Sequence, residues 1–318
     1  MRPLQREIIL LRSAFLKKVR QFFDNEGCIE VETPILHSTG CTEPFIENLK
    51  VTDPTDNSAA FLITSPESHL KSILAEVNQP IFQIAHVFRG GDGSHQSHTI
   101  HTREFLMLEW YVPYFTEFDL MSQIERFINY MAQPFSQRPK QGLRIQILKI
   151  KNLMNQYANC GFDRQSLETA AIELKLATKA EVKADRYDEL FYRVFLTQIE
   201  PRLTELNEPI FVYGYPKELA AYSKTENDIA RRFELYWHGV ELANGYFELT
   251  DPKEQRRRFE AENLIRKSIG KEERSIDTGF LAALEKGLPR CAGVALGIDR
   301  LLMVLAGETR LSKVSPFL

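Results

Sequence analysis

The stretch FRGGDGSHQSHTIHTREFLMLEWY, residues 88–111, determines the architecture of this chain. The segments before and after its glycine-rich part, 80–90 and 104–115, are rich in β-branched and aromatic residues, which is typical of strands. We expect an antiparallel hairpin with a long tip. The tip carries His95, His98 and His101. A glycine-rich loop does not fix the geometry that a metal needs, so we expect these histidines to belong to a loop that covers a ligand.

Alternation along the second strand separates its polar residues. One face carries Glu104, Leu106, Leu108 and Trp110, and the other carries Phe105, Met107, Glu109 and Tyr111. A carboxylate among apolar neighbours is costly unless it is paired. Glu109 therefore predicts either a cationic ligand or a structural Arg or Lys elsewhere. With Arg89 beside the turn, the hairpin offers a cation site, an anion site and a stacking ring, Phe105.

A second acidic segment follows at residues 231–251. Glu234, Glu241 and Glu248 recur every seven residues on strand-like sequence, with Asn244 between them. Carboxylates that converge in a core repel one another unless Mg²⁺ or a substrate ammonium joins them. The spacing thus favours a ligand-binding site over a set of unrelated surface residues.

The order of the remaining segments indicates the fold class. We expect a helix that stops at Gly27, strands at 28–36, 208–218 and 231–249, a strand–turn–helix unit at 59–77 with Ser65 or Ser68 as cap, a helix at 252–270, and a strand followed by an apolar helix at 291–307. This order predicts an α+β fold with an antiparallel sheet flanked by helices. We expect one domain over 1–318, with a mostly helical insertion around 120–205.

The net charge, the cysteine spacing and the length of the apolar runs argue against several classes of protein. The net charge of −3 and the lack of a basic segment argue against a large nucleic-acid footprint. The four cysteines form no C-x-x-C pair, so structural zinc has no support. No long apolar run predicts a membrane span or a leader. We expect a soluble, cytoplasmic protein.

Three segments resemble the motifs of class II aminoacyl-tRNA synthetases. EVETPIL (30–36) resembles motif 1, the 88–111 stretch resembles motif 2, and GVALGIDRLLM (293–303) resembles motif 3. SPESHLK (65–71), YPKE (215–218), ELANGYFELTD (241–251) and ALEKGLP (283–289) resemble the lysine-specific subgroup. Because the first helix leads directly into motif 1, we expect no anticodon-binding domain. The chain is therefore similar to the short paralogues that attach (R)-β-lysine to a lysine of elongation factor P.

This resemblance implies the ligands and the partners. It implies activation by ATP with Mg²⁺, transfer to elongation factor P in support of translation, and a homodimer formed through the first helix and motif 1, without stable binding of tRNA or DNA. Two alternatives stay open, which are an α-lysine-activating ligase with another acceptor and a non-catalytic regulatory paralogue. Residual tRNA charging is a third and weaker one.

The resemblance also implies the roles of single residues. The reaction would depend on Arg89, Arg300 and Glu241. ATP would contact Arg89, His101, Thr102, Phe105, Glu241, Leu242, Gly297 and Arg300. The lysine substrate would contact Ser65, Glu67, Glu109, Tyr111, Asn244, Glu248 and Ala295. Mg²⁺ would be held by Glu234 and Glu241.

The chain departs from the family pattern at a few positions. The family's motif 2 has Arg-x-Glu, and its Glu contacts adenine, whereas this chain has Arg89, Gly90 and Gly91 at these positions, followed by Asp92. A shifted Asp92 or backbone groups would then have to read the base. Ala295 and Ser65 stand where the tRNA enzymes have Gly and Ala. A methyl group at 295 removes volume from the pocket, which we expect to favour a β-amine over an α-amine.

Overall fold

The predicted hairpin forms two strands of a large sheet, next to the edge strand β1 (Ile29–Glu30). The computed structural model describes residues 6–91, 99–135 and 142–317. Strands β5 (Ile81–Phe88) and β6 (Glu104–Pro113) pair antiparallel, as the sequence predicts. Three residues singled out above, Asp92, His95 and His98, fall outside the described ranges.

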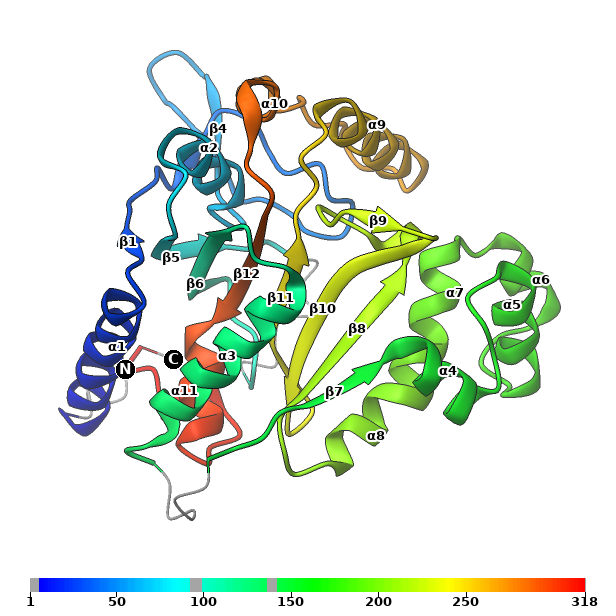
Figure 1. Cartoon of the computed structure of the whole chain (residues 1–318). Coiled ribbons are helices and arrows are strands. Elements are labelled where there is room, and N and C mark those ends of the chain that lie inside the picture. The colour runs from blue at the N-terminus through cyan, green and yellow to red at the C-terminus, as the bar shows by residue number, and fades with distance from the viewer. Residues whose placement is uncertain (1–5, 92–98, 136–141, 318) are drawn as a thin grey trace.

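The sheet is mostly antiparallel. From β6 it continues through β12 (Cys291–Gly297), β11 (Val240–Phe247), β10 (Ile229–Trp237) and β8 (Ile210–Pro216), with β9 (Thr225–Glu226) beside β10. Only the outermost described strands run parallel to their neighbours, β1 (Ile29–Glu30) on β5 and β7 (Gln146–Lys149) on β8. Figure 1 shows this sheet crossing the molecule with helices around it. The predicted α+β fold with an antiparallel sheet flanked by helices is confirmed.

The predicted strand at 28–36 is wrong in extent. It is divided into β1 and β2 (Leu36–His37), which pairs with β4 (Ala59–Leu62) and through it with β3 (Lys50–Thr52) in a separate small sheet. Pro34 lies between the two pieces, and proline cannot donate a hydrogen bond to a sheet ladder. The motif 1 segment therefore passes from one sheet to the other.

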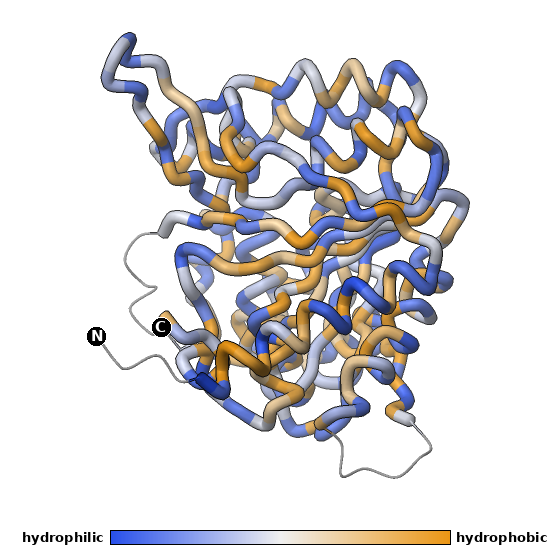
Figure 2. Tube along the Cα trace, turned by 90° about the vertical axis from the view of Figure 1, so that its left-hand side faces the viewer, coloured by the Kyte–Doolittle hydropathy of each residue, from blue (hydrophilic) through white to orange (hydrophobic). Residues whose placement is uncertain are grey.

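One face of the large sheet packs against three helices. These are α1 (Arg6–Asn25), α3 (Glu117–Ala132) and α11 (Ile298–Leu305). Leu108 and Trp110 of β6 lie fully buried in this core, on the face that alternation predicts. Helix α1 ends before Gly27, whose positive φ of 73° glycine adopts without strain. In Figure 2 hydrophobic residues run along the central strands, and the long helices alternate between the two colours.

The remaining helices form two groups. The segment of the chain that connects β7 to β8 contains α4 (Ile150–Ala158), α5 (Arg164–Glu173), α6 (Lys179–Ala184), α7 (Tyr187–Val194), η2 (Phe195–Ile199) and α8 (Glu200–Glu205). These helices share a second hydrophobic cluster with residues of β8 and β10. Above the sheet in Figure 1 lie α2 (Glu67–Val77), α9 (Pro252–Ser268) and α10 (Thr278–Gly287). The stretch 120–205 is thus mostly helical, but α3 belongs to the central core and β7 to the sheet.

The other face of the sheet carries a polar row. The cross-strand register joins Gln83, Glu109, Ala295, Asn244 and Glu234 on β5, β6, β12, β11 and β10. Directly paired residues project to the same face of a sheet. Segments far apart in the sequence therefore bring three of the predicted substrate residues side by side.

Candidate active site

A cavity of about 260 Å³ lies over this polar row. Most of the predicted site residues line it. They are Ser65, Glu67, Arg89, His101, Thr102, Phe105, Glu109, Tyr111, Glu241, Leu242, Asn244, Ala295, Gly297 and Arg300. Glu234 and Glu248 do not line it. Among the described residues no group of three or more His, Cys, Asp or Glu side chains has the geometry of a metal site.

One end of the cavity is cationic. The Arg300 guanidinium donates to the backbone oxygens of Ile100, at 3.2 Å, and Glu241, at 2.9 Å. Arg89 donates to the backbone oxygen of Thr64 at 3.3 Å, and its guanidinium lies 5.3 Å from the centre of the Phe105 ring. Within the described ranges neither arginine has a carboxylate partner at ion-pair distance. Burial, and then the neighbouring Arg89, hold the pKa of Arg300 below its usual value, while Glu241 opposes this. Two adjacent guanidinium groups without counter-ions favour an anionic ligand.

Glu241 faces this cationic end, but Glu234 is engaged elsewhere. Burial raises the pKa of Glu241 to about 7, with Glu234 adding to the shift and Arg300 reducing it. Glu234 pairs with Arg232 through one oxygen. Its other oxygen accepts from the hydroxyls of Tyr215, at 2.5 Å, and Tyr236, at 2.7 Å. Of the two predicted Mg²⁺ ligands, Glu241 alone lines the cavity, and Glu234 would have to exchange a partner to become a second ligand.

The opposite end of the cavity is anionic. Tyr111 donates its hydroxyl to Oε1 of Glu109 at 2.6 Å, and Oε2 of Glu109 is buried without a hydrogen-bond partner. Glu109 is 1% exposed, and no described Lys or Arg lies within ion-pair distance of it. Burial raises the pKa of Glu109 to about 8, with Glu67 adding to the shift. The structural cation considered above is thus absent from the described residues around Glu109, and an ammonium ligand would satisfy the open oxygen.

Glu248 lies outside the cavity lining, in contrast to the other predicted lysine-binding residues. Its side chain is fully buried, and Oε2 lies 2.6 Å from Nζ of Lys71. Lys71 also donates to Glu67 at 2.5 Å, four residues earlier on α2. Burial raises the pKa of Glu248 and lowers that of Lys71, but the two carboxylates bring the pKa of Lys71 above its usual value. At 2.6 Å in a dry environment we take the pair as ionised.

Gly293 forms the floor beside these groups. A Cβ atom there would lie 2.2 Å from the Tyr111 ring and 2.7 Å from Oε1 of Glu248. Only a residue without a side chain lets the ring approach the sheet so closely. Ala295, two residues along β12, is the register partner of Glu109, so its methyl group stands next to the Glu109 side chain.

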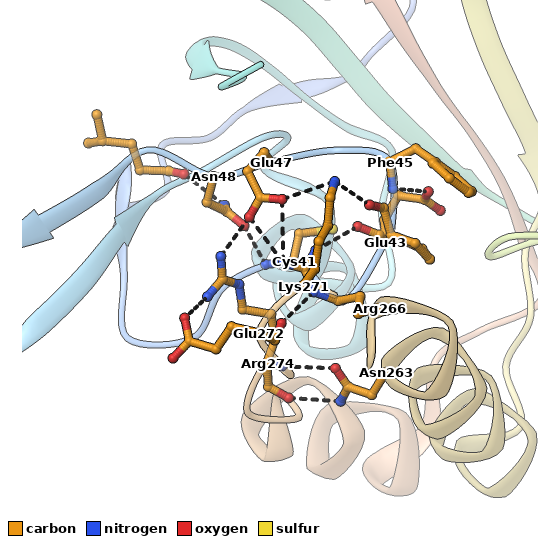
Figure 3. A network of polar contacts seen from close by, with 12 residues as sticks. Cys41, Glu43, Phe45, Glu47, Asn48, Asn263, Arg266, Lys271, Glu272 and Arg274 are labelled. Atoms are coloured by element: carbon orange, nitrogen blue, oxygen red, sulfur yellow. Dashed lines mark hydrogen bonds and ion pairs between the residues drawn. The ribbon is translucent and has the colours of Figure 1, made fainter. Parts of the chain in front are cut away.

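A loop that contributes Cys41, Glu43 and Ile46 to the cavity wall is anchored through Glu47. Figure 3 shows Arg266, Lys271 and Arg274 converging on that carboxylate. Oε1 of Glu47 lies 3.0 Å from Arg266 and 2.7 Å from Arg274, and Oε2 lies 3.3 Å from Lys271. Its backbone oxygen accepts from the amide of Gly90, next to Arg89. One residue therefore ties the loop both to α9 and to the hairpin.

Several residues of this site were not predicted from the sequence. Tyr222 and Glu262 line the cavity without a motif that marks them, and Tyr246 lies in the 241–251 segment but was not among the predicted site residues. Lys71 is different, because the spacing Glu67-x-x-x-Lys71 is the ordinary helix ion-pair spacing and was visible in the sequence. The predicted helix caps are wrong, since Pro66 occupies the N-cap of α2 and no side chain caps it. Ser65 instead accepts from the amide of Glu67 at 3.4 Å.

These features define a class of protein. A family model described as tRNA synthetases class II (D, K and N) matches residues 1–318. The chain belongs to this family. The resemblance drawn from the three motifs is thereby confirmed.

Three relatives of the chain carry the same name. The chain is 37% identical to the elongation factor P–(R)-β-lysine ligase of Pasteurella multocida (strain Pm70), over 98% of this chain and 94% of that protein. It is 36% identical to the ligases of the same name from Proteus mirabilis (strain HI4320) and Salmonella typhi, over 97% of this chain and 94% of each. The similarity thus extends across nearly the whole chain.

Proposed function

We propose that this protein is an ATP-dependent ligase that activates (R)-β-lysine as an acyl-adenylate and transfers it to a lysine side chain of elongation factor P. The observation that carries the proposal is the polarity of the cavity. Two guanidinium groups without carboxylate partners face one end, and a buried carboxylate with an open oxygen faces the other. The names of the relatives supply the acceptor and the β-amino acid.

The cationic end suits ATP and the substrate carboxylate. Arg89 presents a planar fork for the α-phosphate and the carboxylate, and Phe105 and Arg300 enclose the adenine between them. In the first step a carboxylate oxygen attacks the α-phosphorus and pyrophosphate leaves. Positioning and charge neutralisation supply most of the rate. When bound, Mg²⁺ would neutralise phosphate charge, and Glu241 is the cavity carboxylate that would hold it.

The anionic end suits a diamino acid. Glu109 and Tyr111 would bind the distal ammonium, Glu67 would meet the amine nearer the carboxylate, and Asn244 would add a hydrogen bond. In the second step the neutral amine of the acceptor lysine forms a bond to the acyl carbon. The bond from that carbon to the AMP oxygen breaks, and the amine loses its proton.

Pyrophosphate exchange with purified protein tests the proposal. We expect exchange with (R)-β-lysine to exceed exchange with L-α-lysine, and mass spectrometry to find elongation factor P heavier by one β-lysyl group. Ala295→Gly should shift the ratio of the two kcat/KM values toward α-lysine by roughly 10- to 200-fold, because it restores pocket volume. A preference for α-lysine in the parent protein would favour the α-lysine-activating alternative. Lack of exchange with both would favour a regulatory paralogue.

A homodimer is part of the same proposal. Ile9, Leu10, Ile29, Ile35 and Leu36 are large apolar residues on α1, on the edge strand β1 and on the motif 1 segment, and each is at least 41% exposed. An apolar surface at a sheet edge favours association with a second copy. Sedimentation velocity should give about twice the mass of the chain, and Leu10→Lys should lower this mass.

The proposed acceptor is a translation factor, which implies that this protein is cytoplasmic. No described helix is long and apolar enough to span a membrane.

A further inference from the structure

Arg232 is a buried arginine that contacts the cavity wall without lining the cavity itself. It is 8% exposed, and its guanidinium makes three hydrogen bonds. Nε donates to Oδ1 of Asn244 at 3.2 Å, Nη1 donates to the backbone oxygen of Leu219 at 2.9 Å, and Nη2 pairs with Oε1 of Glu234. The centre of the Tyr215 ring lies 4.7 Å from the guanidinium carbon. Contacts to three nitrogens and to the ring hold this planar group in one orientation.

The helical insertion supports this arrangement. Tyr215 of β8 packs against Phe191 of α7, with ring centroids 6.3 Å apart, and Tyr236 of β10 packs against Phe195 of η2 at 6.4 Å. Both tyrosine hydroxyls donate to Oε2 of Glu234. The insertion thus fixes the carboxylate partner of the arginine, although the insertion holds none of the predicted site residues.

The contact with Arg232 determines which way the Asn244 carboxamide faces. Arginine only donates hydrogen bonds, so the atom of Asn244 next to it is the oxygen. The amino group therefore points away from Arg232, and no described residue accepts a hydrogen bond from it. Because Asn244 lines the cavity, a bound ligand can accept that bond. An amino group donates, so it suits a carboxylate oxygen and not an ammonium group.

We propose that Arg232 is a positioning residue for the substrate carboxylate, because it fixes the Asn244 carboxamide with its amino group toward the cavity. The inference rests on the proposed function, and it concerns the carboxyl end of the amino acid and not the two amines. The planar guanidinium is essential to this role, since it serves Asn244 and Glu234 at once with two different nitrogens. A lysine at this position keeps the charge, but its ammonium is a point charge that does not reproduce the fork.

The test compares (R)-β-lysine with 1,4-diaminopentane of the same configuration, which has the same chain and both amines but no carboxylate. Calorimetric titration gives the dissociation constant of each ligand in the parent protein, Arg232→Lys, Asn244→Ala and the double variant. Arg232→Lys should weaken β-lysine binding by roughly tenfold, as for one hydrogen bond to a charged group, and diamine binding by less than about twofold. In the Asn244→Ala background the same substitution should weaken β-lysine binding by less than about threefold, since residues that act as one unit are not additive.

Asn244→Asp tests the orientation without a change at Arg232. The aspartate keeps the contact with Arg232 and places its second oxygen where the amino group stood, facing the substrate carboxylate. β-Lysine binding should therefore be weaker than in Asn244→Ala by roughly tenfold or more, because like charges repel, whereas diamine binding should not weaken. This variant keeps the inference testable if Arg232→Lys does not fold.

Three results would overturn the inference. Equal losses for β-lysine and the diamine in Arg232→Lys would mean that the substitution disturbs the whole cavity. A full loss on adding Arg232→Lys to Asn244→Ala would mean that Arg232 does not act through Asn244. If β-lysine binds no more weakly to Asn244→Asp than to Asn244→Ala, then the carboxamide faces another way.

Failure of the proposed function gives a different pattern. Pyrophosphate exchange by the parent protein tests the ligase activity, whereas the binding comparison requires neither ATP nor exchange. If the parent protein supports no exchange but the variants show the expected binding losses, the ligase proposal fails and the role of Arg232 stands. L-α-Lysine with 1,5-diaminopentane is the matched pair of ligands if the protein prefers the α isomer. Exchange by the parent protein together with any of the three results above would overturn the role of Arg232 alone.

Discussion

Glu109→Gln should stabilise the ligand-free protein at pH 8 and at the same time weaken substrate binding. Burial raises the pKa of this carboxyl from 4.5 to about 8, which corresponds to roughly 5 kcal/mol in favour of the neutral acid. The folded protein then holds a proton that the unfolded chain has lost between about pH 5 and pH 8. Its stability falls by roughly 1.4 kcal/mol per pH unit across that window. Glutamine, which has no such proton, removes this contribution.

Denaturant unfolding at pH 6 and pH 8 measures the effect. The gain from Glu109→Gln should be larger at pH 8 by roughly 2–3 kcal/mol. In pyrophosphate exchange the same variant should raise the KM for β-lysine by roughly 30-fold or more, since an ammonium loses its carboxylate. Glu104→Gln is the matched control, because Glu104 lies on the opposite face of the same strand with a side chain 56% exposed.

Two results would contradict the role of Glu109 as a carboxylate kept for a ligand. If Glu109→Gln destabilises the ligand-free protein at pH 8, then the carboxylate has a counter-ion within the protein and is not reserved for a ligand. If stability rises but the KM does not change, then the ammonium binds elsewhere. Binding of β-lysine at pH 7 should also release a proton into the buffer in the parent protein, and calorimetry in two buffers should show less release in the variant.

Three further substitutions test other parts of the site. Gly293→Ala should cost roughly 1–3 kcal/mol in unfolding experiments because its Cβ overlaps the Tyr111 ring, and unchanged stability would mean that the ring moves freely. Glu47→Gln should cost roughly 3 kcal/mol, since it leaves Arg266, 1% exposed, without a carboxylate; a change within 0.5 kcal/mol, about that of surface substitutions, would show that backbone carbonyls suffice for it. Glu241→Gln should raise the Mg²⁺ concentration needed for half-maximal exchange, and an unchanged requirement would remove Glu241 as a ligand.

Local periodicity predicted a large part of the fold and of the cavity. Alternation along β6 is a property of the strand itself, so it assigned Glu109 and Tyr111 to the cavity face before any partner was known. The motif resemblance added residues such as Arg300 that periodicity does not mark. Their chemical roles stay predictions, although the geometry brings them together.

Two of the differences depend on contacts between segments that are far apart in the sequence. Glu234 accepts a hydrogen bond from Tyr215 of β8, a contact that only the sheet register determines, and pairs with Arg232 of its own strand. Glu248 meets Lys71 from a helix far away in the sequence. The broken strand at 28–36 has a local cause, Pro34, which the alternation alone did not weigh.

The ion cluster of Lys71, Glu67 and Glu248 restricts how such a site can evolve. Loss of Lys71 leaves two buried carboxylates without their cation, at a cost of roughly 3–5 kcal/mol, while a whole domain is stable by only about 5–15 kcal/mol. A lineage that lost Lys71 first would pass through a poorly folded ancestor, so Lys71 tends to persist as long as both glutamates do. Small residues on the cavity wall, Ser65 and Ala295, can vary at little cost to folding. New substrate preferences should therefore arise on the wall and leave the charged floor intact.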